Sequence, residues 1–255
     1  MIDKLTPVTF IIVCPLLFLA GFVDAIGGGG GLISLPAYLF AGLPIHNAIA
    51  TNKLSSACGT SLSTVRFIKN RLVSWKLAVP TIIFAMLGSS LGAHLSLHTS
   101  EKVMKYILFA VLPVAAFFVL NRRLFPDTEG TELIINRRIY FSACTAALII
   151  GVYDGFYGPG TGTFLIIALT VFARLSVSHA NAQTKIINLT TNLTSLVIFL
   201  RNGQVIFVLG LTAAAFNMLG NYIGSGLVMT RGSTIVRPII LVVLVLLLIK
   251  ILSGD

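Results

Sequence analysis

Four charged residues, Asp24, Lys53, Asp154 and Lys185, lie within helix-length segments rather than in the loops between them. The chain holds 18 Lys and Arg and 8 Asp and Glu, and the other charges can be placed in loops or at segment ends. A charge at the centre of a bilayer costs roughly 2.5 to 3.5 kcal/mol on insertion scales, so these four need partners or water. The simplest arrangement sets one acid near one base, twice. Such groups can bind an anion, and an aspartate among them can carry a proton.

Each lysine stands beside a row of small polar residues. The steps along both rows are four, three and four, as in Asn52, Ser56, Gly59 and Ser63, and then Thr184, Asn188, Thr191 and Ser195. Residues at this spacing share one face of a helix, and their hydroxyl and amide groups offer neutral donors to an anion. We expect Asn52, Ser56, Thr184 and Asn188 to contact a substrate together with Lys53 and Lys185. Two alternatives stay open: the rows only join helices by hydrogen bonds, and the lysines reach to an interface.

A glycine-rich segment follows each aspartate, GGGGG at 27–31 and GPGTG at 158–162. Glycine lets a membrane helix unwind around a cavity, and a helix that restarts there points its positive N-terminal end inward. Such ends bind anions. The expected contact positions are Gly29, Gly30, Gly31, Gly160, Thr161 and Gly162. In the alternative, the glycines serve close helix packing and Asp24 and Asp154 cap broken helices.

The two halves of the chain repeat one another. Asp154 follows Asp24 by 130 positions and Lys185 follows Lys53 by 132, and at the second shift AMLGSSLG (85–92) aligns with NMLGNYIG (217–224). Internal duplication of this kind is typical of transporters. We therefore divide the chain into a first membrane repeat over 1–120, a polar linker over 121–138 and a second membrane repeat over 139–255.

Composition indicates a membrane protein that is entirely helical. Hydrophobic residues make up 56% of the chain and charged residues 10%, and the mean hydropathy is +0.96. About eight segments are long enough to cross a layer of about 30 Å. They cover 8–26, 47–69, 77–93, 103–120, 139–153, 180–201, 205–228 and 235–252, and two short apolar pieces cover 31–41 and 163–173. The fold class is thus an all-α polytopic membrane protein with two short, glycine-broken half-helices.

The net charge of +10 comes from cations that gather between the spans. Such clusters orient a protein in the membrane and predict no nucleic-acid binding. The loop at 66–76 is rich in cations, whereas its counterpart in the second repeat has only Arg201. This difference favours repeats of inverted topology, and a parallel arrangement stays open because it places equally many cations on one side.

The ordered motifs resemble the TauE/SafE sulfite-exporter-like family. The resemblance rests on GFVDAIGGGGGLISLPAYLFAGLPIHNAIATNKLSSACGTSLS (21–63), GVYDGFYGPGTGTFLIIAL (151–169) and ANAQTK (180–185), and extends over nearly the whole chain. It implies a polytopic carrier of the bacterial or archaeal inner membrane that moves small sulfur-containing anions such as sulfite, sulfonates or sulfoacetate. The signature positions it implies are Gly28 to Gly31, Asn52, Lys53, Gly158 to Gly162 and Gln183 to Lys185.

We therefore expect a secondary transporter of a small anion, with an anion channel as the alternative. No enzyme activity, cofactor or metal site is expected, because GGGGGL lacks the lysine of a phosphate-binding loop and the four histidines lack metal-ligand spacing. Asp24 and Asp154 are candidates for proton coupling or charge pairing. The expected partners are the lipid bilayer and the anionic substrate, and a homodimer stays open.

Overall fold

The computed structural model describes residues 6–100 and 136–231, together with Lys102, Val103, Tyr106, Ile235 and Pro238. Most of the expected spans over 103–120 and 235–252, and most of the linker over 121–138, lie outside the described residues. The division into two repeats joined by that linker therefore stays a prediction.

Every regular element in the described ranges is an α-helix. In chain order the helices are α1 (Pro7–Gly27), α2 (Gly31–Phe40), α3 (Ile45–Lys69), α4 (Trp75–Leu97), α6 (Arg137–Phe156), α7 (Thr161–Val171), α8 (Val177–Arg201) and α9 (Phe207–Arg231). Hydropathy and helix-break residues predicted these elements to within a few residues. The all-helical class is confirmed for the described part of the chain.

Four of the described helices, α1, α4, α6 and α9, are long and apolar enough to cross a membrane. The 25-residue helices α3 and α8 are long enough, at about 37 Å, but more polar. Helices α2 and α7 reach only about 15 to 17 Å, half of the hydrocarbon layer. The most polar long helices are therefore those that the fold must shield from lipid.

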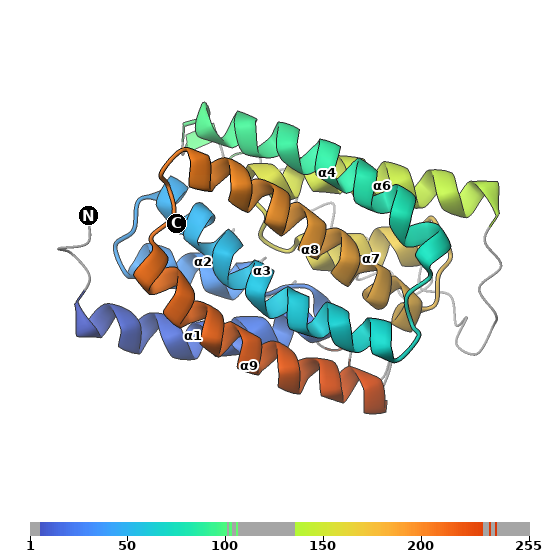
Figure 1. Cartoon of the computed structure of the whole chain (residues 1–255), viewed down its shortest axis with the longest axis horizontal. Coiled ribbons are helices and arrows are strands. Elements are labelled where there is room, and N and C mark those ends of the chain that lie inside the picture. Colours follow the sequence, from blue (N-terminus) through green and yellow to red (C-terminus); the bar gives the residue numbers. More distant parts are fainter. Residues whose placement is uncertain are drawn as a thin grey trace.

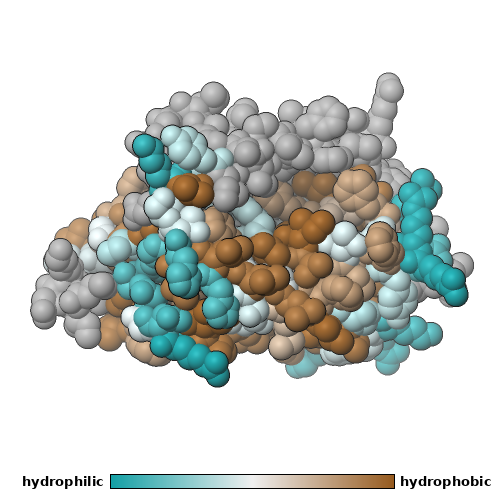
Figure 2. Space-filling view, turned by 90° about the horizontal axis from the view of Figure 1, so that it is seen from above, coloured by the Kyte–Doolittle hydropathy of each residue, from teal (hydrophilic) through white to brown (hydrophobic). Residues whose placement is uncertain are grey.

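The helices lie in an elongated bundle in which α1 packs along α9 and α4 along α6, with α3 and α8 between these pairs (Figure 1). In this view α1 and α3 run from left to right, whereas α6 and α8 run from right to left. A broad hydrophobic area covers the middle of the face seen in Figure 2, and hydrophilic residues gather toward both ends. This distribution fits a belt in contact with lipid tails.

Glycines bring the outer helix pairs into backbone contact. A Cβ added to Gly88 or Gly92 on α4 would lie within 2.3 Å of a carbonyl oxygen of α6. The repeat-related Gly220 and Gly224 on α9 face carbonyl oxygens of α1 in the same way, at 2.5 Å or less. Small residues allow such close approach between membrane helices. The glycines shared by AMLGSSLG and NMLGNYIG thus bind each half of the chain to the first helix of the other half.

Candidate functional site

Two buried ion pairs join the halves of the molecule. The Lys53 Nζ lies 2.8 Å from Oδ2 of Asp154, and the Lys185 Nζ lies 3.2 Å from Oδ2 of Asp24. Three of the side chains are at most 3% exposed and that of Asp24 is 12% exposed. Each lysine therefore pairs with the aspartate of the other half. Coulomb attraction within each pair offsets part of the cost of removing both charges from water.

Each aspartate stands one turn before a helix break. Helix α1 ends at Gly27, and Gly28 adopts φ +73° while its N–H donates to the Asp24 carbonyl oxygen at 2.9 Å. Helix α6 ends at Phe156, and Gly158 adopts φ +94°. Only glycine adopts this left-handed conformation without strain. The glycines thus end both helices just past their carboxylates.

The two breaks meet backbone to backbone. A Cβ added to Gly28 would lie 2.2 Å from the carbonyl carbon of Gly162. The backbone N–H of Thr163 donates to the Gly28 carbonyl oxygen at 3.2 Å, and its hydroxyl donates to that of Gly27 at 2.7 Å. These hydrogen bonds satisfy carbonyl groups at the end of α1 that have no hydrogen-bond partner within the helix. Close contact between the two breaks explains the need for glycine on both sides.

The half-helices restart at the same place, since α2 begins at Gly31 and α7 at Thr161. Both residues line a small cavity, so the N-terminal ends of two helices border it. These ends carry partial positive charge that favours an anion. The predicted half-helices over 31–41 and 163–173 agree with α2 and with α7, which begins two residues earlier.

The cavity holds about 20 Å³, enough for a single water molecule and too little for an oxyanion of several heavy atoms. Its walls come from α1, α3, α6 and α8 as well as from the two breaks. The lining residues are Asp24, Gly28, Gly31, Asn52, Lys53, Ser56, Asp154, Gly158, Thr161, Gly162, Asn188 and Asn192. One ammonium, two carboxylates and three side-chain amides therefore face one small space.

Hydrogen bonds orient the amides in the cavity wall. The Ser56 hydroxyl donates to Oδ1 of Asn52 at 3.4 Å, and the Asn192 amide donates to Oδ1 of Asn188 at 3.3 Å. Because these bonds engage the oxygens, the N–H groups of Asn52 and Asn188 are the parts best suited to serve an acceptor. These two amides can therefore donate hydrogen bonds to an acceptor in the cavity, whereas the two carboxylates in the same wall can only accept them.

The site predicted from sequence is brought together only in part. Nine of the expected positions line the cavity: Asp24, Gly31, Asn52, Lys53, Ser56, Asp154, Thr161, Gly162 and Asn188. Five lie outside this lining: Gly29, Gly30, Gly160, Thr184 and Lys185. Asn192 was missed, although it follows Asn188 by one helical turn and its repeat partner is Thr60. That spacing was the available signal.

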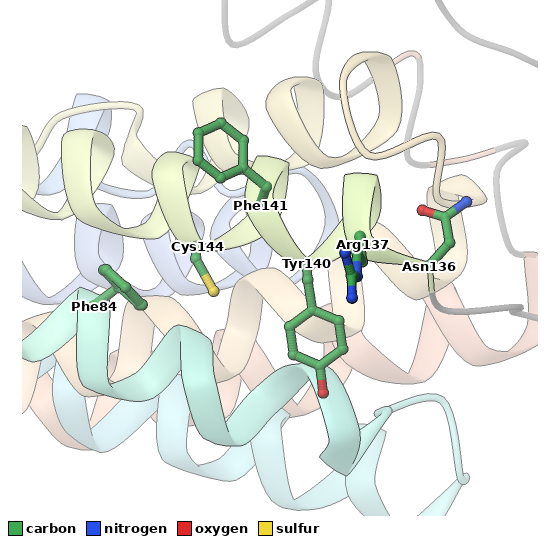
Figure 3. A pocket seen from close by; sticks show the side chains of 6 residues that line it. All are labelled: Phe84, Asn136, Arg137, Tyr140, Phe141 and Cys144. Carbon is green, nitrogen blue, oxygen red and sulfur yellow. The ribbon is translucent and has the colours of Figure 1, made fainter.

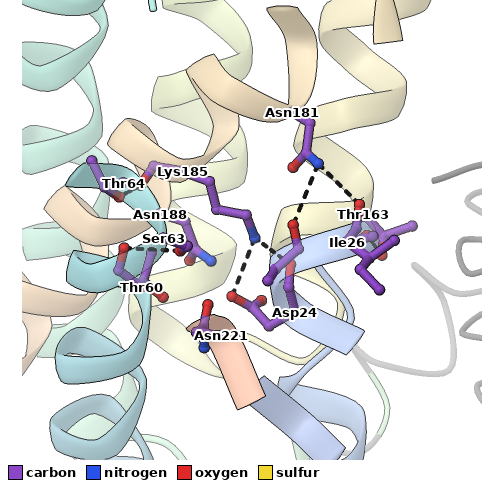
Figure 4. A network of polar contacts seen from close by, with 12 residues as sticks. Asp24, Ile26, Thr60, Ser63, Thr64, Thr163, Asn181, Lys185, Asn188 and Asn221 are labelled. Atoms are coloured by element: carbon purple, nitrogen blue, oxygen red, sulfur yellow. Dashed lines mark hydrogen bonds and ion pairs between the residues drawn. The ribbon is translucent and has the colours of Figure 1, made fainter. Parts of the chain in front are cut away.

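Lys185 holds the end of α1 rather than facing the cavity. Its ammonium donates to the backbone oxygen of Asp24 as well as to its carboxylate, and the Asn181 amide donates to the carbonyl of Ile26 at 3.0 Å (Figure 4). On the far side, the Thr64 hydroxyl donates to the Lys185 carbonyl at 3.2 Å. Helix α8 therefore binds the last turn of α1 through several polar contacts.

A second, open hollow lies between α4 and α6 near the start of α6 (Figure 3). Its lining is mostly apolar and consists of Phe84, Asn136, Arg137, Tyr140, Phe141 and Cys144. Cys144 lies ten residues before Asp154, about 15 Å along the helix. This hollow is therefore separate from the ion pairs. Within the described ranges, no group of three or more His, Cys, Asp or Glu side chains could hold a metal ion.

Comparison with known proteins places these features in context. The family model described as "Sulfite exporter TauE/SafE" matches residues 13–251. The chain is 34% identical to a "Probable membrane transporter protein" of Haemophilus influenzae, with 88% of this chain and 87% of that protein aligned. It is 35% identical to the "Probable membrane transporter protein YfcA" of Escherichia coli K12, over 93% and 87% of the two chains. No solved structure shows a significant match.

Proposed function

The chain belongs to the TauE/SafE sulfite exporter family of multi-pass membrane transporters, and we propose that it is a secondary transporter of a small sulfur-containing oxyanion. The substrate would bind at mid-membrane, between the N-terminal ends of α2 and α7 and Lys53, whereas Lys185, the second lysine expected from the sequence, lies outside the cavity lining. The observation that carries this proposal is the single cavity that Gly31 and Thr161 share with Lys53. Sulfite and sulfonates present acceptor oxygens to such donors.

The opposite directions of equivalent helices support a repeat of inverted topology (Figure 1). Carriers of that kind bind substrate at the repeat interface between discontinuous helices and expose it to each side in turn. Here the cavity lies where the two breaks meet, and its volume of about 20 Å³ requires the helices to separate before an oxyanion enters. This requirement favours a carrier over a permanently open channel.

Ion pairs in the site set a condition on binding. Lys53 and Lys185 are both neutralised by aspartates, so an anion must replace a carboxylate or join a pair that is already balanced. An uncompensated charge in a site of low polarity is costly. Movement of protons with the anion would meet this condition, and Asp24 and Asp154 are the groups proposed to carry them.

Transport by purified protein in liposomes tests the proposal. Labelled sulfite should enter faster when unlabelled sulfite fills the vesicles. The reason is that a carrier returns to the outer face faster with substrate bound than without it. Flux proportional to concentration without this acceleration would indicate the channel alternative. Matched vesicles should be assayed with a sulfonate and with nitrate. The proposal would be refuted if none of the three anions gives saturable flux and none raises the melting temperature of the purified protein.

A further inference from the structure

We propose that the two Lys–Asp pairs have unequal roles, and this inference rests on the proposed anion transport. In the pair of Lys53 and Asp154, the lysine exchanges the carboxylate for the anion while the carboxylate takes up a proton. In the pair of Lys185 and Asp24, the lysine is a positioning residue that holds the end of α1. The repeat makes the two pairs equivalent in sequence, so their difference arises from the tertiary structure.

The first observation is the position of each lysine relative to the cavity. Lys53 and Asp154 both line it, at a separation of 2.8 Å. Lys185 does not line it, and its side chain is fully buried. An anion that enters the cavity therefore meets the ammonium of Lys53 directly. It meets the other pair only through Asp24, which has the charge that repels it.

The second observation is the bonding of Lys185. Its ammonium donates to the backbone oxygen of Asp24, which lies in the last turn of α1 and also accepts the N–H of Gly28. Cations at this position stabilise the negative end of a helix and provide a partner for its last carbonyl groups. Release of Lys185 to a substrate would remove that partner inside the membrane. The structure thus assigns Lys185 to the helix break.

Charge balance explains why the exchange needs a proton. When the ammonium of Lys53 turns to an oxygen of the anion, the Asp154 carboxylate loses its counter-ion while still buried at 3% exposure. One proton taken from water on the open side onto a carboxylate oxygen restores neutrality. No covalent bond other than this O–H forms, and the reverse transfer releases the anion. A monoanion then moves together with one proton.

No other group near Asp154 is placed to take up the proton in its stead. Asp24 also lines the cavity, but it carries the same charge as Asp154 and cannot act as the counter-ion that Lys53 provides. The Tyr153 hydroxyl is turned to the loop, where it donates to the Pro159 carbonyl at 2.7 Å. Helix α7 contributes no titratable side chain. Helices α4, α7 and α8 pack against α6, and their titratable and charged groups are Lys76, His94, His179, Lys185 and Arg201. Asp24 and Lys53 line the cavity together with Asp154.

Four matched variants test the assignment: Lys53→Gln, Asp154→Asn, Lys185→Gln and Asp24→Asn. Sulfite affinity is measured by thermal shift in detergent, and sulfite and proton uptake are measured in liposomes that contain a pH dye. Lys53→Gln should weaken affinity at least about tenfold, as expected for loss of a charged hydrogen bond. Asp154→Asn should bind sulfite but abolish proton uptake and the pH dependence of transport. These two results together identify the exchanging pair.

The other two variants serve as the repeat-related controls. Lys185→Gln should lower the melting temperature of the unliganded protein yet keep the pH profile of transport, and Asp24→Asn should keep proton uptake. If Lys185→Gln does not fold, Lys185→Arg retains the donors and should keep both affinity and pH profile. Loss of proton uptake in Asp24→Asn but not in Asp154→Asn would overturn the assignment. So would a tenfold loss of affinity in Lys185→Arg at unchanged melting temperature.

The outcomes also separate this inference from the proposed function. Wild-type protein that neither binds nor transports sulfite, a sulfonate or nitrate refutes the anion site itself. Wild-type protein that transports sulfite while Asp24 and Asp154 variants lose proton coupling to the same degree leaves the anion site standing. That result would refute unequal pairs.

Discussion

The contact between the two helix breaks gives the sharpest quantitative prediction. Gly28 has φ +73°, and a Cβ there would lie 2.2 Å from the carbonyl carbon of Gly162. Alanine at this position therefore meets two penalties, one from the left-handed backbone and one from a backbone atom that cannot rotate away. Substitution of Gly28 by alanine should destabilise the protein through both.

Gly42 is the matched control, because it also has positive φ, +84°, but has no atom within 4 Å of an added Cβ. Left-handed strain costs about 1 to 2 kcal/mol for a residue with a Cβ, so Gly42→Ala should lose this amount. Overpacking adds about 1 to 3 kcal/mol, so Gly28→Ala should lose about 2 to 5 kcal/mol in total.

Thermal unfolding of both variants and the wild type in one detergent measures the difference. For a chain of this size 1 kcal/mol shifts the melting temperature by roughly 2 to 4 °C, so Gly28→Ala should melt roughly 2 to 12 °C below Gly42→Ala. Gly28→Ala should also lose anion-dependent stabilisation, because the breaks that border the cavity move apart. Equal melting temperatures of the two variants would refute the backbone contact between α1 and α7.

Three further predictions concern burial and packing. Lys185→Met should lower the free energy of unfolding by about 3 to 5 kcal/mol, because it leaves the Asp24 carboxylate unpaired. Adding Asp24→Asn should recover part of this loss. A double variant that recovers no stability in a denaturation experiment would argue against the ion pair. Gly92→Ala should lower the yield of folded protein on gel filtration, because its Cβ would lie 2.0 Å from the Val152 carbonyl oxygen, whereas normal yield would argue against the α4–α6 contact. Ser89→Ala removes a buried hydroxyl that forms hydrogen bonds with two groups of α8, each at 2.7 Å. It should lower the free energy of unfolding by about 0.6 to 2 kcal/mol, and a variant as stable as the wild type would contradict this.

Local patterns in the sequence predict the elements of this protein well. Apolar length indicates α1, α4, α6 and α9, and the glycine-rich segments indicate where α2 and α7 begin. The steps of four, three and four predict which polar residues share a face of α3 and of α8. Each of these features depends on neighbours within a few turns of one helix. Such information is carried by the order of residues alone.

The identity of partners across the molecule depends on the tertiary structure. The sequence predicts that two acids meet two bases, but not that Asp154 meets Lys53 while Asp24 meets Lys185. Helical periodicity states which face a side chain occupies and not which helix packs against that face. The packed structure decides this pairing, because it brings α3 to the end of α6 and α8 to the end of α1.

The same limit applies to the cavity. Sequence spacing treats Lys53 and Lys185 as equals, since each follows its aspartate at almost the same interval. Only the packed molecule turns one ammonium into the cavity and binds the other to the backbone at the end of α1. The chain order thus determined which residues carry charge into the membrane. The three-dimensional packing decided which of them can reach a solute, because access depends on atoms that are distant in the sequence.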